Sequence, residues 1–367
     1  MDHVARVRRL QSALPEAKLD LLLITHLPNL RYLCGFTGSA GALLVCRDGA
    51  VLFTDGRYKT QAREEVRNAR IVIGKQSAVL AAAERVAVSD HDTKRGGRGL
   101  PALGIEGEWM SAGMRDRVAS ALRGKARVRS APPLVERARM VKDAEEVRLI
   151  RNAVELGASL FAVARQTIEP GVSELAVAAA MEYEARSQGA EGMSFPTIIA
   201  SGERSAMIHG RASEARIPRR GFVVCDFGII LAGYCSDRTR TVHVGRASSE
   251  AREFYGAVLA AQQAAIAAVR PGVTASEVDA AARNVLRRRK LARYFTHSTG
   301  HGLGLEIHEA PRVADGQAQT LEAGMVITIE PGAYVAGQWG VRIEDVVVVT
   351  ASGCEVLTPA DKQLVVI

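Results

Sequence analysis

The feature that most constrains the fold of this chain is a set of acidic residues inside apolar, strand-forming segments. Asp226 interrupts the run GFVVCDFGIIL, and Asp237 follows eleven residues later in a second such run. Glu330 and Glu344 do the same on two predicted strands of MVITIEPGAYVAGQWGVRIEDVVVV, which a Pro/Gly-rich turn joins. A buried carboxylate is costly unless a positive group meets it. The pattern therefore predicts a metal site built into a core.

Histidines lie between the two acidic pairs, in the glycine-rich stretch HSTGHGLGLEIHEAP at 297–311. Four carboxylates and one imidazole can hold two divalent ions, as in two-metal hydrolases. Because oxygen ligands predominate, Mn²⁺ is favoured over a thiolate-type zinc site, while Co²⁺, Zn²⁺ and Fe²⁺ stay open.

The chain is long enough, at 367 residues, for two domains. Apolar segments at 19–25, 41–46 and 50–55 are typical of strands, and 58–66 is typical of an exposed helix. We expect an α/β N-terminal domain over 1–132 and an α+β domain over 140–367.

An internal repeat predicts the architecture of the second domain. A long helical pattern opens at Asp143, and the segment PGVS at 170–173 then starts another helix. PGVT at 271–274 follows a second long helix in the same way, about a hundred residues later. Each copy continues into a glycine-rich segment with a histidine and a pair of strands with two carboxylates. We expect two pseudo-equivalent halves with the metals at their junction.

Charge and cysteine content argue against other classes of protein. The net charge is +8, yet basic residues are scattered; the clusters at 94–98 and 287–290 indicate a loop and a helix end. Five cysteines without CxxC spacing predict reduced thiols that fill a core. No apolar stretch reaches the roughly 18 residues of a membrane span. We expect a cytoplasmic protein with no nucleic-acid or membrane partner.

The order of the motifs resembles that of a known enzyme family. DFG, YCSDRTRT, HSTGHGLGLEIHEAP, ITIEPGAY and VRIED follow one another as in the Xaa-Pro peptidases, prolidase and aminopeptidase P, of the pita-bread metallopeptidase family. The resemblance covers the chain from about residue 140 to the C terminus. It implies a creatinase/aminopeptidase-like catalytic domain with a pseudo-two-fold repeat behind a creatinase/prolidase N-terminal-like domain. The implied metal ligands are Asp226, Asp237, His301, Glu330 and Glu344.

The resemblance also implies roles around the metals. Glu330 would carry a proton from the attacking water to the leaving proline nitrogen. His308 would stabilise the oxyanion, and His209 would contact the substrate. Phe195 and His297 would line the pocket near the proline.

Strand alternation adds two residues that support the ligands. Thr239 lies two residues beyond Asp237 on the same face and is expected to bond a ligand. Arg342 lies two residues before Glu344 and would steady its charge or meet a substrate carboxylate. For the substrate role, Arg342→Ala should lower activity more than metal occupancy.

The choice between branches of the family depends on two features that disagree. Arg312 resembles the prolidase arginine that binds a C-terminal carboxylate. The longer N-terminal stretch NLRYLCGFTGSAGALLV resembles small bacterial aminopeptidase P-like proteins. We expect aminopeptidase P acting on proline-containing peptides as a homodimer, with prolidase as the alternative. Methionine aminopeptidase, whose members usually lack the front domain, and a metal-free binding relative are further alternatives.

Overall fold

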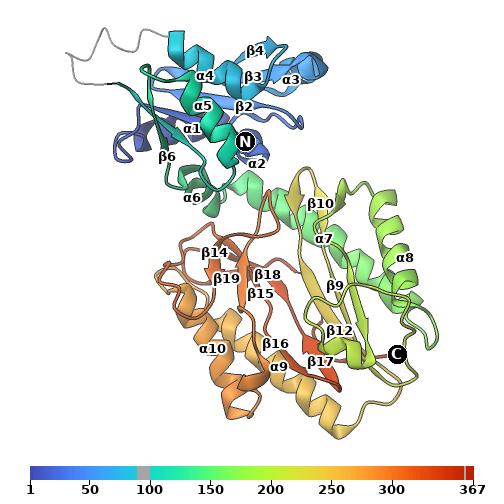
Figure 1. Cartoon of the computed structure of the whole chain (residues 1–367). Coiled ribbons are helices and arrows are strands. Elements are labelled where there is room, and N and C mark those ends of the chain that lie inside the picture. Colours follow the sequence, from blue (N-terminus) through green and yellow to red (C-terminus); the bar gives the residue numbers. More distant parts are fainter. Residues whose placement is uncertain (89–99, 359–360) are drawn as a thin grey trace. The chain divides into compact units, whose positions relative to one another are not determined.

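The computed structural model describes residues 1–88, 100–358 and 361–367, which form two units, 1–139 and 140–367 (Figure 1). The helix α6 (Leu134–Met140) covers the residues between the two predicted domains. The basic cluster at 94–98 lies outside the described residues. Among the helices that are described, none combines the length and the apolar character that crossing a membrane requires.

The first unit is an α/β sheet structure. Its strands are β1 (Leu21–Ile24), β2 (Ala42–Cys46), β3 (Gly49–Asp55), β4 (Arg70–Gly74), β5 (Ala102–Ile105) and β6 (Arg127–Ser130). Its other helices are α1 (His3–Ala13), α2 (Leu27–Cys34), η1 (Gly56–Tyr58), α3 (Lys59–Glu65), α4 (Ala78–Val88) and α5 (Ala112–Ala121). The strands lie in the order β4-β3-β2-β1-β5-β6, antiparallel from β1 to β3 and parallel elsewhere. The three predicted strands and the helix α3 are confirmed.

The second unit contains the long helices and the predicted acidic strands. Its helices are α7 (Ala144–Thr167), α8 (Glu174–Ser187), η2 (Gly202–Ala206), α9 (Ser249–Ala268), α10 (Ala275–Arg288) and η3 (Ala292–Tyr294). Its strands are β7 (Gly192–Met193), β8 (Ile198–Ser201), β9 (Gly221–Phe227), β10 (Ile229–Leu231), β11 (Tyr234–Cys235), β12 (Arg238–Val244), β13 (Gly300–Gly302), β14 (Glu309–Val313), β15 (Val326–Ile329), β16 (Gly332–Val335), β17 (Trp339–Arg342), β18 (Asp345–Val349), β19 (Cys354–Val356) and β20 (Val365–Val366). The main sheets are β20-β12-β9-β8 and β14-β13-β15-β18-β19.

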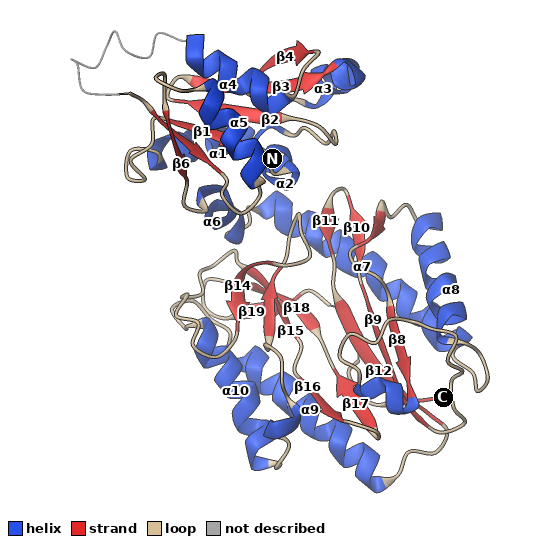
Figure 2. Cartoon of the chain, in the orientation of Figure 1, coloured by secondary structure: helices blue, strands red, loops and turns tan. Residues whose placement is uncertain are grey.

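Two helix pairs flank these sheets and confirm the internal repeat (Figure 2). Asp143 caps α7 and forms a capping box with Glu146, as the acidic first turn predicts. Ser173 caps α8 and Thr274 caps α10, each accepting a hydrogen bond from the third helical N–H. Helices α7 and α8 pack on β8, β9 and β12, whereas α9 and α10 pack on the second set of strands. The unit therefore has an α+β fold with a pseudo-two-fold repeat, as the resemblance implies.

The four predicted carboxylate ligands lie at strand ends where the two halves meet. Asp226 is the penultimate residue of β9, and Asp237 directly precedes β12. Glu330 follows β15, and Glu344 precedes β18. The sequence pattern predicts that Glu330 and Glu344 lie within two strands joined by a turn. The structure instead inserts the β16–β17 hairpin between them, and the chain leaves regular strand geometry at both glutamates.

Candidate metal centre

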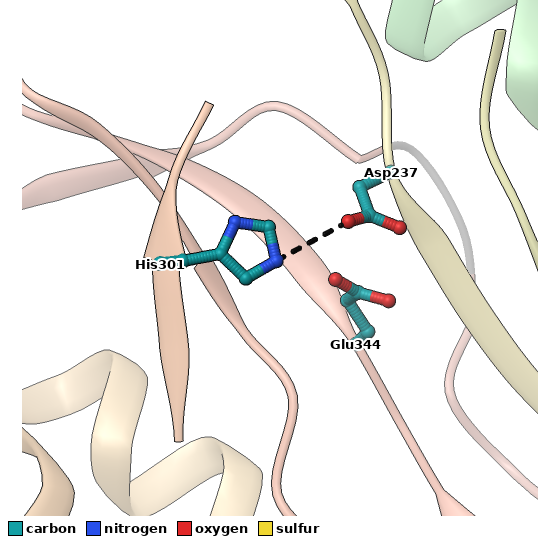
Figure 3. Close-up of side chains that lie close together, drawn as sticks. All are labelled: Asp237, His301 and Glu344. Atoms are coloured by element: carbon teal, nitrogen blue, oxygen red, sulfur yellow. Dashed lines mark ion pairs between the residues drawn. The ribbon is translucent and has the colours of Figure 1, made fainter. Parts of the chain in front are cut away.

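Three of the predicted ligands, Asp237, His301 and Glu344, converge at the junction of the halves. Each offers one ligand atom, and these atoms all lie within 4.8 Å of one another. Figure 3 shows the imidazole of His301 directed at the two carboxylates. His301 Nε2 lies 3.5 Å from Asp237 Oδ2 and 3.5 Å from Glu330 Oε1, so a fourth predicted ligand borders the group.

The backbone fixes the orientation of His301. Its Nδ1 lies 3.0 Å from the carbonyl oxygen of Gly302, a contact that places the proton on Nδ1 and leaves Nε2 free to act as a ligand. A Cβ at Gly300 would lie 1.9 Å from the carbonyl oxygen of Thr328, so only glycine fits there. Burial favours neutral His301, but Asp237 and Glu330 outweigh burial and raise its pKa to about 9.

The carboxylates destabilise one another as anions. Burial, with Asp226 adding to the effect, raises the pKa of Asp237 to about 6. Burial also raises the pKa of Glu330 to about 7 and, together with Asp237, raises that of Glu344 well above its usual range. Burial is the main cause of each rise and the neighbouring carboxylates add to it, so a bound cation would stabilise all three anions.

Two carboxylate oxygens support the same conclusion. Asp226 Oδ1 and Glu344 Oε1 are buried without a hydrogen-bond partner among the described residues. Buried oxygens with free lone pairs are the donors that a divalent cation requires. The carboxylates and His301 can therefore bind divalent metal ions.

Thr239 and Arg342 contact the carboxylates through hydrogen bonds. Thr239 Oγ1 donates to Glu344 Oε2 at 2.8 Å and accepts from Arg342 Nε at 3.0 Å. Arg342 Nη2 lies 2.5 Å from Asp226 Oδ2, and Nη1 donates to Tyr334 Oη at 2.7 Å. The sequence predicts that Arg342 steadies Glu344 or meets a substrate carboxylate, whereas in the structure Arg342 pairs with Asp226. Because Arg342 is only 2% exposed, its contacts favour positioning of Asp226 over the predicted contact with substrate.

Two of the predicted histidines lie beside the cluster. The ring of His308 packs edge to face on His301, with centroids 4.5 Å apart. Burial, and then His301, lowers the pKa of His308 and keeps it neutral. His297 Nε2 lies 3.0 Å from Tyr334 Oη, and burial followed by Arg342 lowers its pKa to about 3. Both rings are therefore uncharged near neutral pH.

The other predicted residues lie around this group. His209 is exposed and within electrostatic range of His297 and His308. Phe195 is half-buried, and its ring lies against Gly228, where an added Cβ would meet it at 3.2 Å. Arg312 is exposed on β14 and pairs in register with His301. Cross-strand partners share a sheet face, so Arg312 lies on the face that carries the metal-facing histidine.

Sequence reasoning missed Thr328 and Tyr334. Thr328 Oγ1 accepts a hydrogen bond from the backbone N–H of His301 at 3.1 Å and lies 3.5 Å from Glu330 Oε1. Its position two residues before Glu330 in an apolar strand was an available signal. Tyr334 lies in the quoted motif ITIEPGAY, but its contacts with Arg342 and His297 depend on the hairpin that the sequence did not reveal.

Comparisons with known proteins agree with this geometry. Residues 148–351 match Metallopeptidase family M24, and residues 6–141 match the Creatinase/Prolidase N-terminal domain. The Xaa-Pro dipeptidase of Pyrococcus horikoshii is 35% identical over 98% of this chain and 98% of its own length.

Solved structures extend the similarity to the fold. An Xaa-Pro dipeptidase from Bacillus anthracis is 38% identical, with a TM-score of 0.93 and 100% of both chains covered. An X-Pro aminopeptidase from Thermotoga maritima is 35% identical, with a TM-score of 0.88, covering 98% of this chain and 99% of that one. The chain therefore belongs to metallopeptidase family M24, has its pita-bread fold, and is a metal-dependent enzyme of the Xaa-Pro peptidase type.

Proposed function

We propose that this enzyme is an Xaa-Pro dipeptidase, a prolidase, which hydrolyses the bond between a first residue and a C-terminal proline. Arg312 carries the proposal: its exposed side chain shares a sheet face with His301. A guanidinium there can bind the carboxylate that a dipeptide presents directly after proline. Relatives named Xaa-Pro dipeptidase, alike over nearly the full chain, support this branch. These relatives favour prolidase over aminopeptidase P, which we expected from the N-terminal stretch.

The acidic residues supply most of the ligands for the metal ions of the proposed hydrolytic centre. Divalent ions supply Lewis acidity at the scissile carbonyl and acidify the attacking water. We propose two ions, Mn²⁺ in preference to Co²⁺ or Zn²⁺, because oxygen ligands predominate. The proposed ligands are Asp226, Asp237, His301, Glu330 and Glu344.

The remaining side chains act on the peptide. Glu330 moves a proton from the attacking water to the leaving proline nitrogen. His308, uncharged, donates a hydrogen bond to the carbonyl oxygen as negative charge develops there, a contribution of a few kcal/mol. His297 and Phe195 line the pocket for the proline ring, and His209 contacts the substrate from its exposed segment. Homodimer formation and a cytoplasmic location stay predictions.

A comparison of substrates tests the proposal. Manganese-restored enzyme should cleave Ala-Pro and Gly-Pro, and it should cleave Ala-Pro-Ala at least tenfold more slowly, since a longer chain moves the carboxylate away from Arg312. Arg312→Met should raise KM for Ala-Pro about tenfold or more, whereas Arg165→Met, at an exposed position on α7, should not. Equal or faster cleavage of the tripeptide would instead assign aminopeptidase P.

A further inference from the structure

Strand β12 has a second polar face that the hydrolytic reaction does not use. Successive side chains of a strand point to opposite sides. Thr239 bonds Glu344, and Thr241 bonds the backbone of Arg342, so these threonines face the metal cluster. Arg238 and Arg240 therefore lie on the other side of the strand. Both are buried, at 3% and 2% exposure.

The carboxylate near these two arginines, that of Asp345, already has several hydrogen-bonding partners. Asp345 is fully buried and accepts hydrogen bonds from Arg240 Nη2 at 2.7 Å and Gln262 Nε2 at 2.8 Å. It also pairs with Lys362. Arg240 and Lys362 thus share one carboxylate, and Arg238 adds a third cation within electrostatic range of it. Among the described residues, Arg238 lies over the ring of Phe161, with its guanidinium carbon 5.2 Å from the ring centroid.

Three buried donor nitrogens of the two arginines have no acceptor among the described residues: Arg238 Nε, Arg238 Nη1 and Arg240 Nε. Burying a guanidinium without a counter-charge and without acceptors costs several kcal/mol. A guanidinium stays protonated at neutral pH, so Arg238 carries a positive charge. The surroundings thus have excess positive charge and excess donors.

We propose that Arg238 and Arg240 bind a small inorganic anion, of the size of chloride, on the buried face of β12. One negative charge would offset the unbalanced cation and accept hydrogen bonds from the free N–H groups. The site is separate from the metal cluster because the strand lies between them. Arg240 also donates to the backbone carbonyl of Glu344. A bound anion therefore stabilises the segment that carries a metal ligand, and it affects stability rather than the chemical step.

Bromide identifies the site directly, because its anomalous scattering separates it from water. Crystals of the manganese-loaded protein grown in sodium bromide should give an anomalous peak within about 3.5 Å of the Arg238 guanidinium. The absence of such a peak, with the guanidinium ordered, would overturn the proposal. This experiment uses the unaltered chain and does not depend on the folding of a variant.

A stability titration tests the role of Arg238. At constant ionic strength, replacing sodium gluconate with sodium chloride should raise Tm along a saturating curve, by about 2 to 4 °C. Arg238→Met keeps an unbranched side chain but removes the charge, and its Tm should not respond to chloride. Arg165→Met, at an exposed position, should respond like the parent. An equal chloride response in Arg238→Met would show that the effect is non-specific and would contradict the assigned site.

Discussion

Thr239 and Glu344 bond each other twice: the threonine hydroxyl donates to Glu344 Oε2 at 2.8 Å, and the Glu344 N–H donates to the Thr239 carbonyl at 3.1 Å. The two residues come from different halves of the repeat and are 105 positions apart. A strand of the first half therefore fixes a carboxylate of the second. The metal cluster depends on this contact between halves and cannot form in either half alone.

Thr239→Val should weaken metal binding about tenfold, because valine keeps the shape of threonine but leaves Glu344 Oε2 without its donor. The matched control is Thr241→Val on the same strand, whose hydroxyl bonds the backbone of Arg342 and no predicted ligand. Titration of the metal-free proteins with Mn²⁺ gives both affinities. Equal affinities for the two variants would show that the hydroxyl of Thr239 does not orient Glu344.

Arg342→Met should lower metal occupancy and activity together. It removes the cation that pairs with Asp226 and leaves a buried carboxylate unmatched, at a cost of about 3 kcal/mol in the free energy of unfolding. Metal analysis of the purified variant beside its Ala-Pro hydrolysis rate measures both quantities. Full occupancy with lost activity would support the substrate contact expected from the sequence and contradict the positioning role.

Asp279→Asn should reduce kcat/KM because Asp279 holds Thr299, which lies two residues before His301. Asp279 Oδ1 accepts hydrogen bonds from the Thr299 N–H at 3.2 Å and the Thr299 hydroxyl at 2.7 Å. Arg283 joins the same carboxylate and also bonds the His297 carbonyl at 2.6 Å. We expect a loss of about 1 to 3 kcal/mol in the free energy of unfolding, together with weaker metal binding.

The control for this change is Glu253→Gln, at an exposed position on α9. It should leave unfolding, metal affinity and hydrolysis unchanged. A variant Asp279→Asn that unfolds more easily but binds metal as tightly as the parent would limit Asp279 to a structural role.

The metal-free protein should lose stability as pH rises. Asp237 and Glu330 have folded-state pKa values of about 6 and about 7, above their ordinary values of 3.8 and 4.5. Groups with raised pKa values contribute stability below the unfolded pKa and lose that contribution as pH rises through the folded value. His301, raised to about 9, has the same sign.

Bound metal ions replace these protons, so the difference in Tm between manganese-loaded and EDTA-treated protein should grow from about pH 5 to about pH 8. Thermal unfolding in a series of buffers measures the difference. A Tm difference that stays constant or narrows toward high pH would contradict the view that the metal ions replace protons on these buried carboxylates.

Local sequence signals predicted much of the fold. Cap residues such as Asp143 and Thr274 satisfy helix N–H groups within a few positions, so they can be recognised without tertiary context. Cys225 fills the core, as expected, because alternation along β9 puts it on the face opposite to Asp226. The cluster at 287–290 lies at the C-terminal end of α10, as expected.

The contacts that assemble the site could not be predicted in this way. The pairing of Arg342 with Asp226 spans 116 positions and depends on how the β16–β17 hairpin returns the chain to β9. The same holds for Arg312, whose place opposite His301 follows from strand register and not from its neighbours in the chain. Sequence patterns indicate which polar residues are costly to bury. The packing of the two halves decides which residues they contact.

The most direct test of the account is metal content and Ala-Pro hydrolysis measured together on the same chelated and restored samples. We predict that EDTA-treated protein is inactive, that Mn²⁺ restores hydrolysis in proportion to bound metal, and that Asp237→Asn lowers both occupancy and rate by more than tenfold. Hydrolysis that persists in metal-free protein, or full metal occupancy without hydrolysis of any Xaa-Pro peptide, would contradict the account.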